Sequence, residues 1–429
     1  MEEFEEAFAR IAGRFARVEP RRQARALLLA TLSDVDSRTC WQLAEAAGDA
    51  SPHRMQRLLG EAVWDADAVR DDVRGYVAET LADPDGVLIV DDTGDVKKGS
   101  CTVGTQRQYT GTAGRIENAQ VAVYCTYATP KGRALVDREV YLPRSWADDP
   151  ARRAQAAVPE QVTFATKPAL ARRMLTRAMD AGVPAGWVTA DEGYGGDRAL
   201  RRLLQGRTTG YVLAVACDHH VTISRAAGPQ RADQIVDRLP SRSWNRRSGG
   251  AGAKGERLYD WAWLPIIAPD DETAGHHWLL VRRRIRDGEL AFYRCWAPQP
   301  VPLSRLVRVA ATRWAVEETF QSSKATVGLD QPQVRRWGSW YRYITLAMLA
   351  HAILTAITVH EQTRPPGEPD LIPLTVAEVR RLFAKLIANP TRTIHDYMAW
   401  SQWRRRHQYR AKTSHYRRQH SQTHQCLST

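Results

Sequence analysis

The sequence predicts an α/β fold: a mixed sheet with flanking helices, interrupted by a β-rich insertion and preceded by an N-terminal helical domain. Three observations support this prediction. Apolar residues recur at helical spacing up to about residue 83, strands and helices alternate from about 85 to 217, and a strand-rich segment at 218–300 precedes two more helices. We therefore expect segments at 1–83, 84–217, 218–300, 301–360 and 361–429, the last being a helical region with a basic tail.

Residues 1–83 contain a pair of short helices separated by the break GDASP. Two interpretations of this pair are open. It could be a helix-turn-helix that reads DNA, with His53, Arg54 and Arg57 on the second helix. It could equally be a plain helical hairpin, because helix pairs are common and this turn is not diagnostic.

The segment 84–217 begins with the buried strand VLIV and continues with NAQVAVYCTYA and ALVDREVYLPRSW, joined by the turn TPKGR. Helix, strand, helix and strand follow, and this order predicts a mixed sheet. In the insertion, RLYDWAWLPI, HWLLVRRRIR and ELAFYRCWAP are predicted strands, and SWNRRSGGAGAKGERL is predicted to be a loop. The segment SRLVRVAATRWAVEETFQSSKATVG predicts one long helix, and WGSWYRYITLAMLAHAILTAIT a second, core-packed one.

The chain of 429 residues has a formal net charge of +13, which favours a polyanionic partner, usually nucleic acid. An Arg-rich composition from a GC-rich genome is the alternative. No acidic residue follows Asp396, so the basic tail is either a solvated arm or a nucleic-acid contact.

The apolar runs look too short for a membrane span of ~20 residues. The scattered cysteines, without a CxxC pair, indicate reduced thiols in a cytoplasm and disfavour a zinc ribbon.

Acidic pairs occur at three places that the predicted fold would bring together. Asp91-Asp92 and Asp191-Glu192 end two strands, and Glu317-Glu318 lies in the helix after the insertion. Neighbouring parallel strands end at the same edge of a sheet, and a packed helix can add a third acid. Such carboxylates repel one another unless a cation lies among them, and hard divalent ions favour oxygen ligands. Any one of these acids alone could be a solvated surface residue.

The stretch RWAVEETFQSSK places Arg313, Glu317 and Lys324 on one helix face, because offsets of 4 and 11 residues fall within about 40° at 100° per residue. With this spacing the chain resembles bacterial insertion-sequence transposases of the DDE superfamily, in the branch with a Tyr-Arg-Glu-Lys signature and a β-rich insert. The chain departs from that signature at Ala310, where the branch tends to have Tyr. The resemblance implies an RNase-H-like core.

The resemblance also selects one acid from each pair. The family's first Asp directly precedes Thr, which points to Asp92, and TADEGYGG and the helix spacing point to Asp191 and Glu317. These three would be the catalytic residues and would bind two Mg²⁺ ions, for which Mn²⁺ could substitute. The implied reaction is strand cleavage at transposon ends and strand transfer into target DNA, in the bacterial cytoplasm at the nucleoid. The implied partners are double-stranded DNA and a second copy in the DNA complex, with no membrane.

Several cations accompany these acids. The resemblance assigns phosphate positioning to Arg313 and Lys324. Lys97, Lys98 and Arg107 follow the first acid and would either bind the DNA backbone or form an exposed basic hairpin. Other functions remain open: a domesticated or inactive transposase-derived DNA-binding protein, an RNase-H-like nuclease without strand transfer, and, more distantly, a glycosidase with paired carboxylates.

Overall fold

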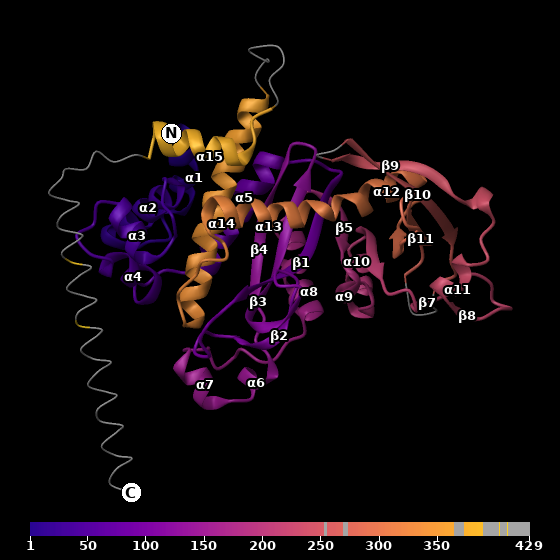
Figure 1. Cartoon of the computed structure of the whole chain (residues 1–429), viewed down its shortest axis with the longest axis horizontal. Coiled ribbons are helices and arrows are strands. Elements are labelled where there is room, and N and C mark those ends of the chain that lie inside the picture. Colours follow the sequence, from indigo (N-terminus) through magenta and orange to yellow (C-terminus); the bar gives the residue numbers. More distant parts are fainter. Residues whose placement is uncertain (253–254, 269–272, 364–372, 389–402, 404–409, 411–429) are drawn as a thin grey trace, which may run out of the picture.

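The computed structural model describes residues 1–252, 255–268, 273–363, 373–388, 403 and 410. Most of the predicted basic tail lies outside these residues. A ten-stranded mixed sheet runs through the molecule, with the N-terminal helices at one end and the strands of the insertion at the other (Figure 1). The predicted α/β class is confirmed.

The sheet has the strand order β2-β3-β1-β5-β6-β12-β11-β10-β9, and β4 also pairs with β3. A separate two-stranded sheet joins β7 and β8. The strands are β1 (Gly86–Val96), β2 (Gln106–Thr110), β3 (Arg115–Thr129), β4 (Gly132–Val140), β5 (Ala185–Ala190), β6 (Gly210–Val215), β7 (His220–Thr222), β8 (Pro229–Arg231), β9 (Asn245–Gly252), β10 (Gly255–Pro265), β11 (His276–Arg284) and β12 (Leu290–Ala297).

The central strands β1, β5 and β6 are parallel, and their apolar runs are buried on both sides. β1 is antiparallel to β3, which continues through a tight connection into β4. The parallel pairing of β1 with β5 ends at Val90 and Ala190. The residues that follow, Asp91 and Asp191, therefore emerge at the same edge of the sheet.

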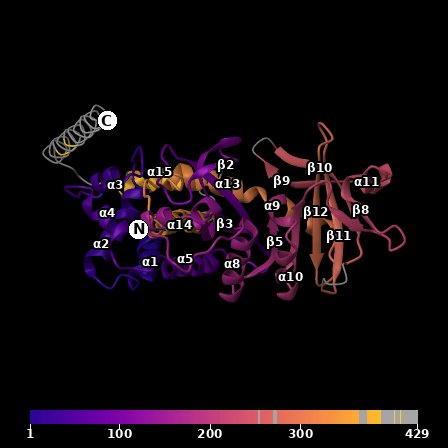
Figure 2. The same ribbon diagram turned by 90° about the horizontal axis from the view of Figure 1, so that it is seen from below.

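Helices lie on both faces of this sheet. In Figure 2, α12 and α13 lie on one side of the strands and α8 and α10 on the other. The helices are α1 (Glu2–Ala12), α2 (Val18–Leu32), α3 (Cys40–Ala46), α4 (His53–Gly60), α5 (Ala66–Leu81), α6 (Arg144–Ala147), α7 (Pro150–Gln155), α8 (Lys167–Asp180), α9 (Glu192–Gly195), α10 (Arg198–Gly206), α11 (Ala232–Val236), α12 (Leu303–Thr312), α13 (Trp314–Val327), α14 (Trp337–Gln362) and α15 (Val376–Leu386), with one 3₁₀ turn at Ser241–Ser243.

Helix α14 is the core-packed helix that the sequence predicts. Helices α1, α2, α4, α5 and α15 all pack against it. It is also long and apolar enough to cross a membrane by length and composition, contrary to the expectation that no run would be. However, 83% of its most apolar window is buried inside the protein, which is the property of a core helix.

The predicted single long helix is wrong, because it is divided into α12 and α13 at Arg313. The backbone N–H groups of Arg313 and Val316 donate to carbonyls three residues earlier, those of Ala310 and Arg313. These tighter turns interrupt the α-helical hydrogen-bond ladder. Arg313 keeps helical dihedral angles (φ −53°, ψ −36°), so the i, i+4 relation to Glu317 survives the break.

The predicted glycine-rich loop of the insertion is also wrong over most of its length. Residues Asn245–Gly252 form β9, an edge strand that pairs antiparallel with β10. Asp260 of β10 accepts hydrogen bonds from Arg246 and Arg283, so cross-strand charge pairs support the pairing. Through β12 and β6 the insertion extends the central sheet, and it adds a small second apolar cluster, which includes Val221, Ile235 and Leu279.

Candidate acidic site at the sheet edge

Asp91 and Asp191 lie where the parallel pairing of β1 with β5 stops. The prediction that Asp91-Asp92 ends its strand is wrong, because β1 stays paired with β3 as far as Val96. Asp191 follows β5 and is the N-cap of α9, where its side chain accepts a hydrogen bond from the Gly193 N–H. The next turn needs a glycine, because a Cβ on Gly195 would lie 1.8 Å from the carbonyl oxygen of Ala214 in β6. This close approach holds the start of α9, and with it Asp191, against the sheet.

Asp91 and Asp92 face opposite sides of the sheet, since successive side chains of a strand alternate. Asp92 faces α8 and α9: Lys167 Nζ lies 2.8 Å from its Oδ2, and the Tyr194 hydroxyl donates to its Oδ1 at 2.9 Å. Asp91 faces α13, where Arg313 Nη1 lies 3.5 Å from its Oδ2. Asp91 therefore points to the helical layer that contains α13, and Asp92 points to the layer that contains α8.

Helix α13 supplies the third acid and two cations. Arg313 Nη2 donates to Glu317 Oε1 at 3.0 Å, so one guanidinium links Glu317 to Asp91. Lys324 Nζ donates to Thr93 Oγ1 at 2.8 Å, one residue beyond the acid pair on β1. The structure thus brings Arg313, Glu317 and Lys324 to the β1 side of α13, as the helical spacing predicts.

Burial and mutual repulsion perturb these acids. Burial, and after it the negative charge of Asp191, raise the pKa of Asp91 to about 7, although Arg313 opposes the shift. The pKa of Asp191 is also raised, first by burial and then by the charge of Asp92. Each shift means that the ionised form is disfavoured in the metal-free protein, so a cation bound among these acids would be stabilised.

The donor set at this edge fits a hard divalent ion. Asp191 lies near enough to Asp91 and Asp92 for their charges to repel, although Asp91 and Asp92 face opposite sides of the sheet. Mg²⁺ typically takes one or two carboxylates together with water and phosphate oxygens. Within the described ranges, no three acidic, His or Cys side chains are already arranged as a complete metal site. Glu317 in particular is held by Arg313 and would have to exchange that partner for a metal.

Replacing Asp91 by asparagine is expected to stabilise the metal-free protein at pH 8 but not at pH 4. The folded pKa of about 7 lies above the ordinary value of 3.8, so the wild-type protein loses stability as the pH rises from about 4 to about 7. One pKa unit corresponds to about 1.4 kcal/mol, so a gain of a few kcal/mol is expected at pH 8. Urea unfolding of both proteins in EDTA at the two pH values measures this. If the difference in the free energy of unfolding between Asp91→Asn and the wild type does not increase from pH 4 to pH 8, the raised pKa of Asp91 is contradicted.

The other predicted cations occupy different environments. Lys97 turns inward: its Nζ donates to the carbonyl of Pro332 at 3.1 Å, and burial lowers its pKa. Lys98 and Arg107 are exposed beside β1 and on β2. On α4, His53, Arg54 and Arg57 are exposed, which is compatible with both interpretations of the helix pair.

Lys167 and Tyr194 were not identified from the sequence. Each donates a hydrogen bond to one of the two carboxylate oxygens of Asp92. Lys167 opens α8 directly after its N-cap Thr166, and Tyr194 lies in TADEGYGG two residues after the acid pair. Both residues are more than 70 positions from Asp92, at separations of 75 and 102. Tyr194 could have been identified from the sequence as an aromatic hydroxyl close to the acid Asp191. No feature of the sequence around Lys167 indicates a contact with Asp92.

A mixed sheet with helices on both faces, and acids where the pairing of two parallel strands stops, defines an RNase-H-like nuclease fold. Residues 10–245 match the family model described as DDE superfamily endonuclease, which covers more than half of the chain. The chain belongs to this family. The match contains Asp92 and Asp191 and ends before Glu317.

The chain is also similar to the probable transposase for insertion sequence element IS701 of Microchaete diplosiphon. The two are 28% identical over 198 residues, which cover 45% of this chain and 48% of the relative. The chain therefore matches about half the length of this curated relative.

Proposed function

We propose that the protein is a DDE transposase, which cleaves DNA strands at transposon ends and joins them to target DNA. The observation that carries the proposal is that Arg313, Glu317 and Lys324 of α13 lie against β1, the strand that holds Asp91 and Asp92. Family membership and the insertion-sequence relative support it. The net charge of +13 suits a DNA substrate.

In this proposal Asp92, Asp191 and Glu317 hold two Mg²⁺ ions, for which Mn²⁺ substitutes. Bound divalent metal would activate the attacking oxygen and stabilise the departing one in phosphodiester chemistry. Tyr194 and Lys167 orient the Asp92 carboxylate in the metal-free protein. Glu317 becomes free for the metal when Arg313 turns from it to a DNA phosphate, and a guanidinium is well suited to such a phosphate.

The remaining cations would bind DNA around the acidic edge. Lys324 lies beside Thr93 and can reach a phosphate held over β1. Lys98, just after β1, and Arg107, on β2, are exposed, whereas Lys97 would first have to leave the Pro332 carbonyl. We propose that the DNA complex contains two copies of the chain, one for each transposon end, as the family resemblance implies.

Incubating the purified protein with labelled DNA that carries the flanks of its own gene tests this function. With Mg²⁺ or Mn²⁺ we expect defined cuts at the repeat boundaries, and pre-cut ends should be joined to a target plasmid. Cutting without joining would favour a nuclease without strand transfer. Binding without cutting under either metal would favour a domesticated DNA-binding protein, and the absence of any salt-dependent DNA binding would contradict both.

A further inference from the structure

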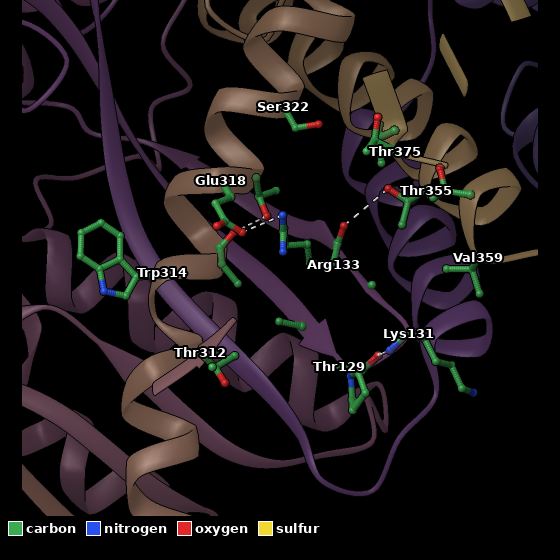
Figure 3. A pocket seen from close by; sticks show the side chains of 18 of the residues that line it. Thr129, Lys131, Arg133, Thr312, Trp314, Glu318, Ser322, Thr355, Val359 and Thr375 are labelled. Atoms are coloured by element: carbon green, nitrogen blue, oxygen red, sulfur yellow. Dashed lines mark hydrogen bonds and ion pairs between the residues drawn. The ribbon is translucent and has the colours of Figure 1, made fainter. Parts of the chain in front are cut away.

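A large groove lies on the side of α13 that faces away from the acidic edge. Its volume is about 1100 Å³. It is bounded by the β3–β4 connection, by Ser248–Gly250 and Arg257 of the β9–β10 hairpin, and by α12, α13 and α14. Figure 3 shows Arg133, Glu318 and Trp314 around its interior. The groove therefore joins the catalytic core, the insertion and the helix that carries Glu317.

The groove is strongly cationic. Among the residues that line it, Glu318 is the one acidic side chain, against four cations: Lys131, Arg133, Arg257 and Arg308. Small hydroxyl side chains also line it, Thr129, Thr312 and Ser322 among them (Figure 3). Cations with small polar groups and glycine backbone are the groups that contact DNA phosphates without regard to sequence.

Two of the arginines converge on the single acid. Arg133 Nη2 lies 2.7 Å from Glu318 Oε2, and Arg257 Nη2 lies 3.3 Å from Glu318 Oε1. Both arginines and Glu318 remain partly exposed, with side-chain exposures of 42%, 29% and 40%. Two guanidinium groups around one carboxylate form an oxyanion site that a phosphate group also satisfies.

Glu317 and Glu318 point to different sides of α13 and contact different partners. Adjacent residues of a helix point about 100° apart. Glu317 contacts Arg313 at the acidic edge, whereas Glu318 contacts arginines of β4 and β10 in the groove. A DNA strand bound in the groove would thus lie against the same helix as the proposed reaction site.

We infer that this groove binds the phosphodiester backbone of DNA, and that Glu318 occupies the phosphate position until DNA replaces it on Arg133 and Arg257. The inference rests on the proposed function, since it takes DNA as the substrate. It adds a DNA site outside the acidic edge and gives Glu318 a role opposite to that of Glu317. Glu318 competes with DNA, whereas Glu317 serves the reaction.

The test measures DNA binding by fluorescence anisotropy in EDTA, so that metal-dependent chemistry does not contribute. The probes are a labelled duplex and its isolated labelled strand, each titrated at several salt concentrations. The variants are Arg133→Ala with Arg257→Ala in one protein, and Glu318→Gln alone. Arg286→Ala is the matched control, because Arg286 is an exposed arginine of the same insertion with a side-chain exposure of 82%. Thermal unfolding verifies that each variant is folded.

We expect the double variant to bind at least one of the probes about tenfold or more weakly. The slope of log affinity against log salt should fall by about 1.8 on the duplex (about 0.9 for each lost phosphate contact) or by about 1.4 on the single strand (about 0.7 for each). Glu318→Gln should bind several-fold more tightly, and Arg286→Ala should bind as the wild type. A purely structural role of Glu318 would not increase affinity.

Unchanged binding and salt slope in the double variant, on both probes, would overturn the inference, and so would unchanged or weaker binding by Glu318→Gln. Either result would leave the proposed function intact as long as the wild-type protein binds DNA in a salt-dependent way. Failure of the wild-type protein itself to bind DNA would instead contradict the proposed function and the inference with it.

Discussion

Replacing Asp92 by alanine is expected to abolish DNA cleavage while folding and DNA binding are retained. In the proposed reaction Asp92 shares the divalent metal with Asp191, and a bound metal contributes several kcal/mol to the transition state, or roughly 1,000-fold or more in rate. The substitution removes no apolar packing. It frees Lys167, which is partly exposed and can be solvated. The measurement is single-turnover cleavage of labelled end DNA, with anisotropy and thermal unfolding on the same preparation.

Two further variants make the result specific. Glu192→Gln removes an exposed acid next to Asp191 and should cleave as the wild type. Asp91→Asn removes the neighbouring acid that faces Arg313 on α13. If Asp91→Asn abolishes cleavage and Asp92→Ala does not, the first catalytic acid is Asp91, on the Glu317 side of the sheet. Normal cleavage by both Asp91→Asn and Asp92→Ala would show that neither acid of β1 is catalytic.

Among the substitutions considered, replacing Asp137 by alanine is expected to lower the free energy of unfolding the most. Asp137 lies in β4, is 0% exposed, and accepts hydrogen bonds from Arg70 of α5 and Arg177 of α8. Removing one partner of a buried ionic network leaves uncompensated charge, at a typical cost of about 3–5 kcal/mol. Because the two arginines come from different helices, the substitution should also loosen α5 and α8 against the sheet. Urea unfolding at pH 7 measures the change.

The control for Asp137 is another acid that pairs with two arginines at the surface. Asp260 contacts Arg246 and Arg283, and its side chain is 15% exposed while those arginines are 59% and 38% exposed. Exposed pairs typically contribute about 1 kcal/mol or less, so Asp260→Ala should unfold near the wild-type midpoint. Similar losses for the two variants would show that burial of the Asp137 network is not what makes it stabilising.

The sequence by itself was enough for most helices and strands, and it predicts the acids, whose catalytic role stays a prediction. The run VLIV predicts the buried part of β1, because four consecutive apolar residues suit a strand covered on both faces, and the parallel neighbour β5 ends directly before Asp191. The spacing of Arg313, Glu317 and Lys324 placed these residues on one helix face, since that face depends only on the 3.6-residue period. These are local properties, and the side chains involved do not need partners elsewhere in the chain.

Contacts between distant segments were decided by the tertiary structure alone. The glycine-rich stretch Asn245–Gly252 became a strand because β10 offers it a free edge to pair with, which outweighs its weak intrinsic preference. Asp92 meets Lys167 and Tyr194, and Glu318 meets Arg133 and Arg257, only because the sheet register and the packing of α8, α9 and α13 bring them together. The sequence period fixes which face a residue occupies on its own element, whereas its partner across the fold depends on how the elements pack.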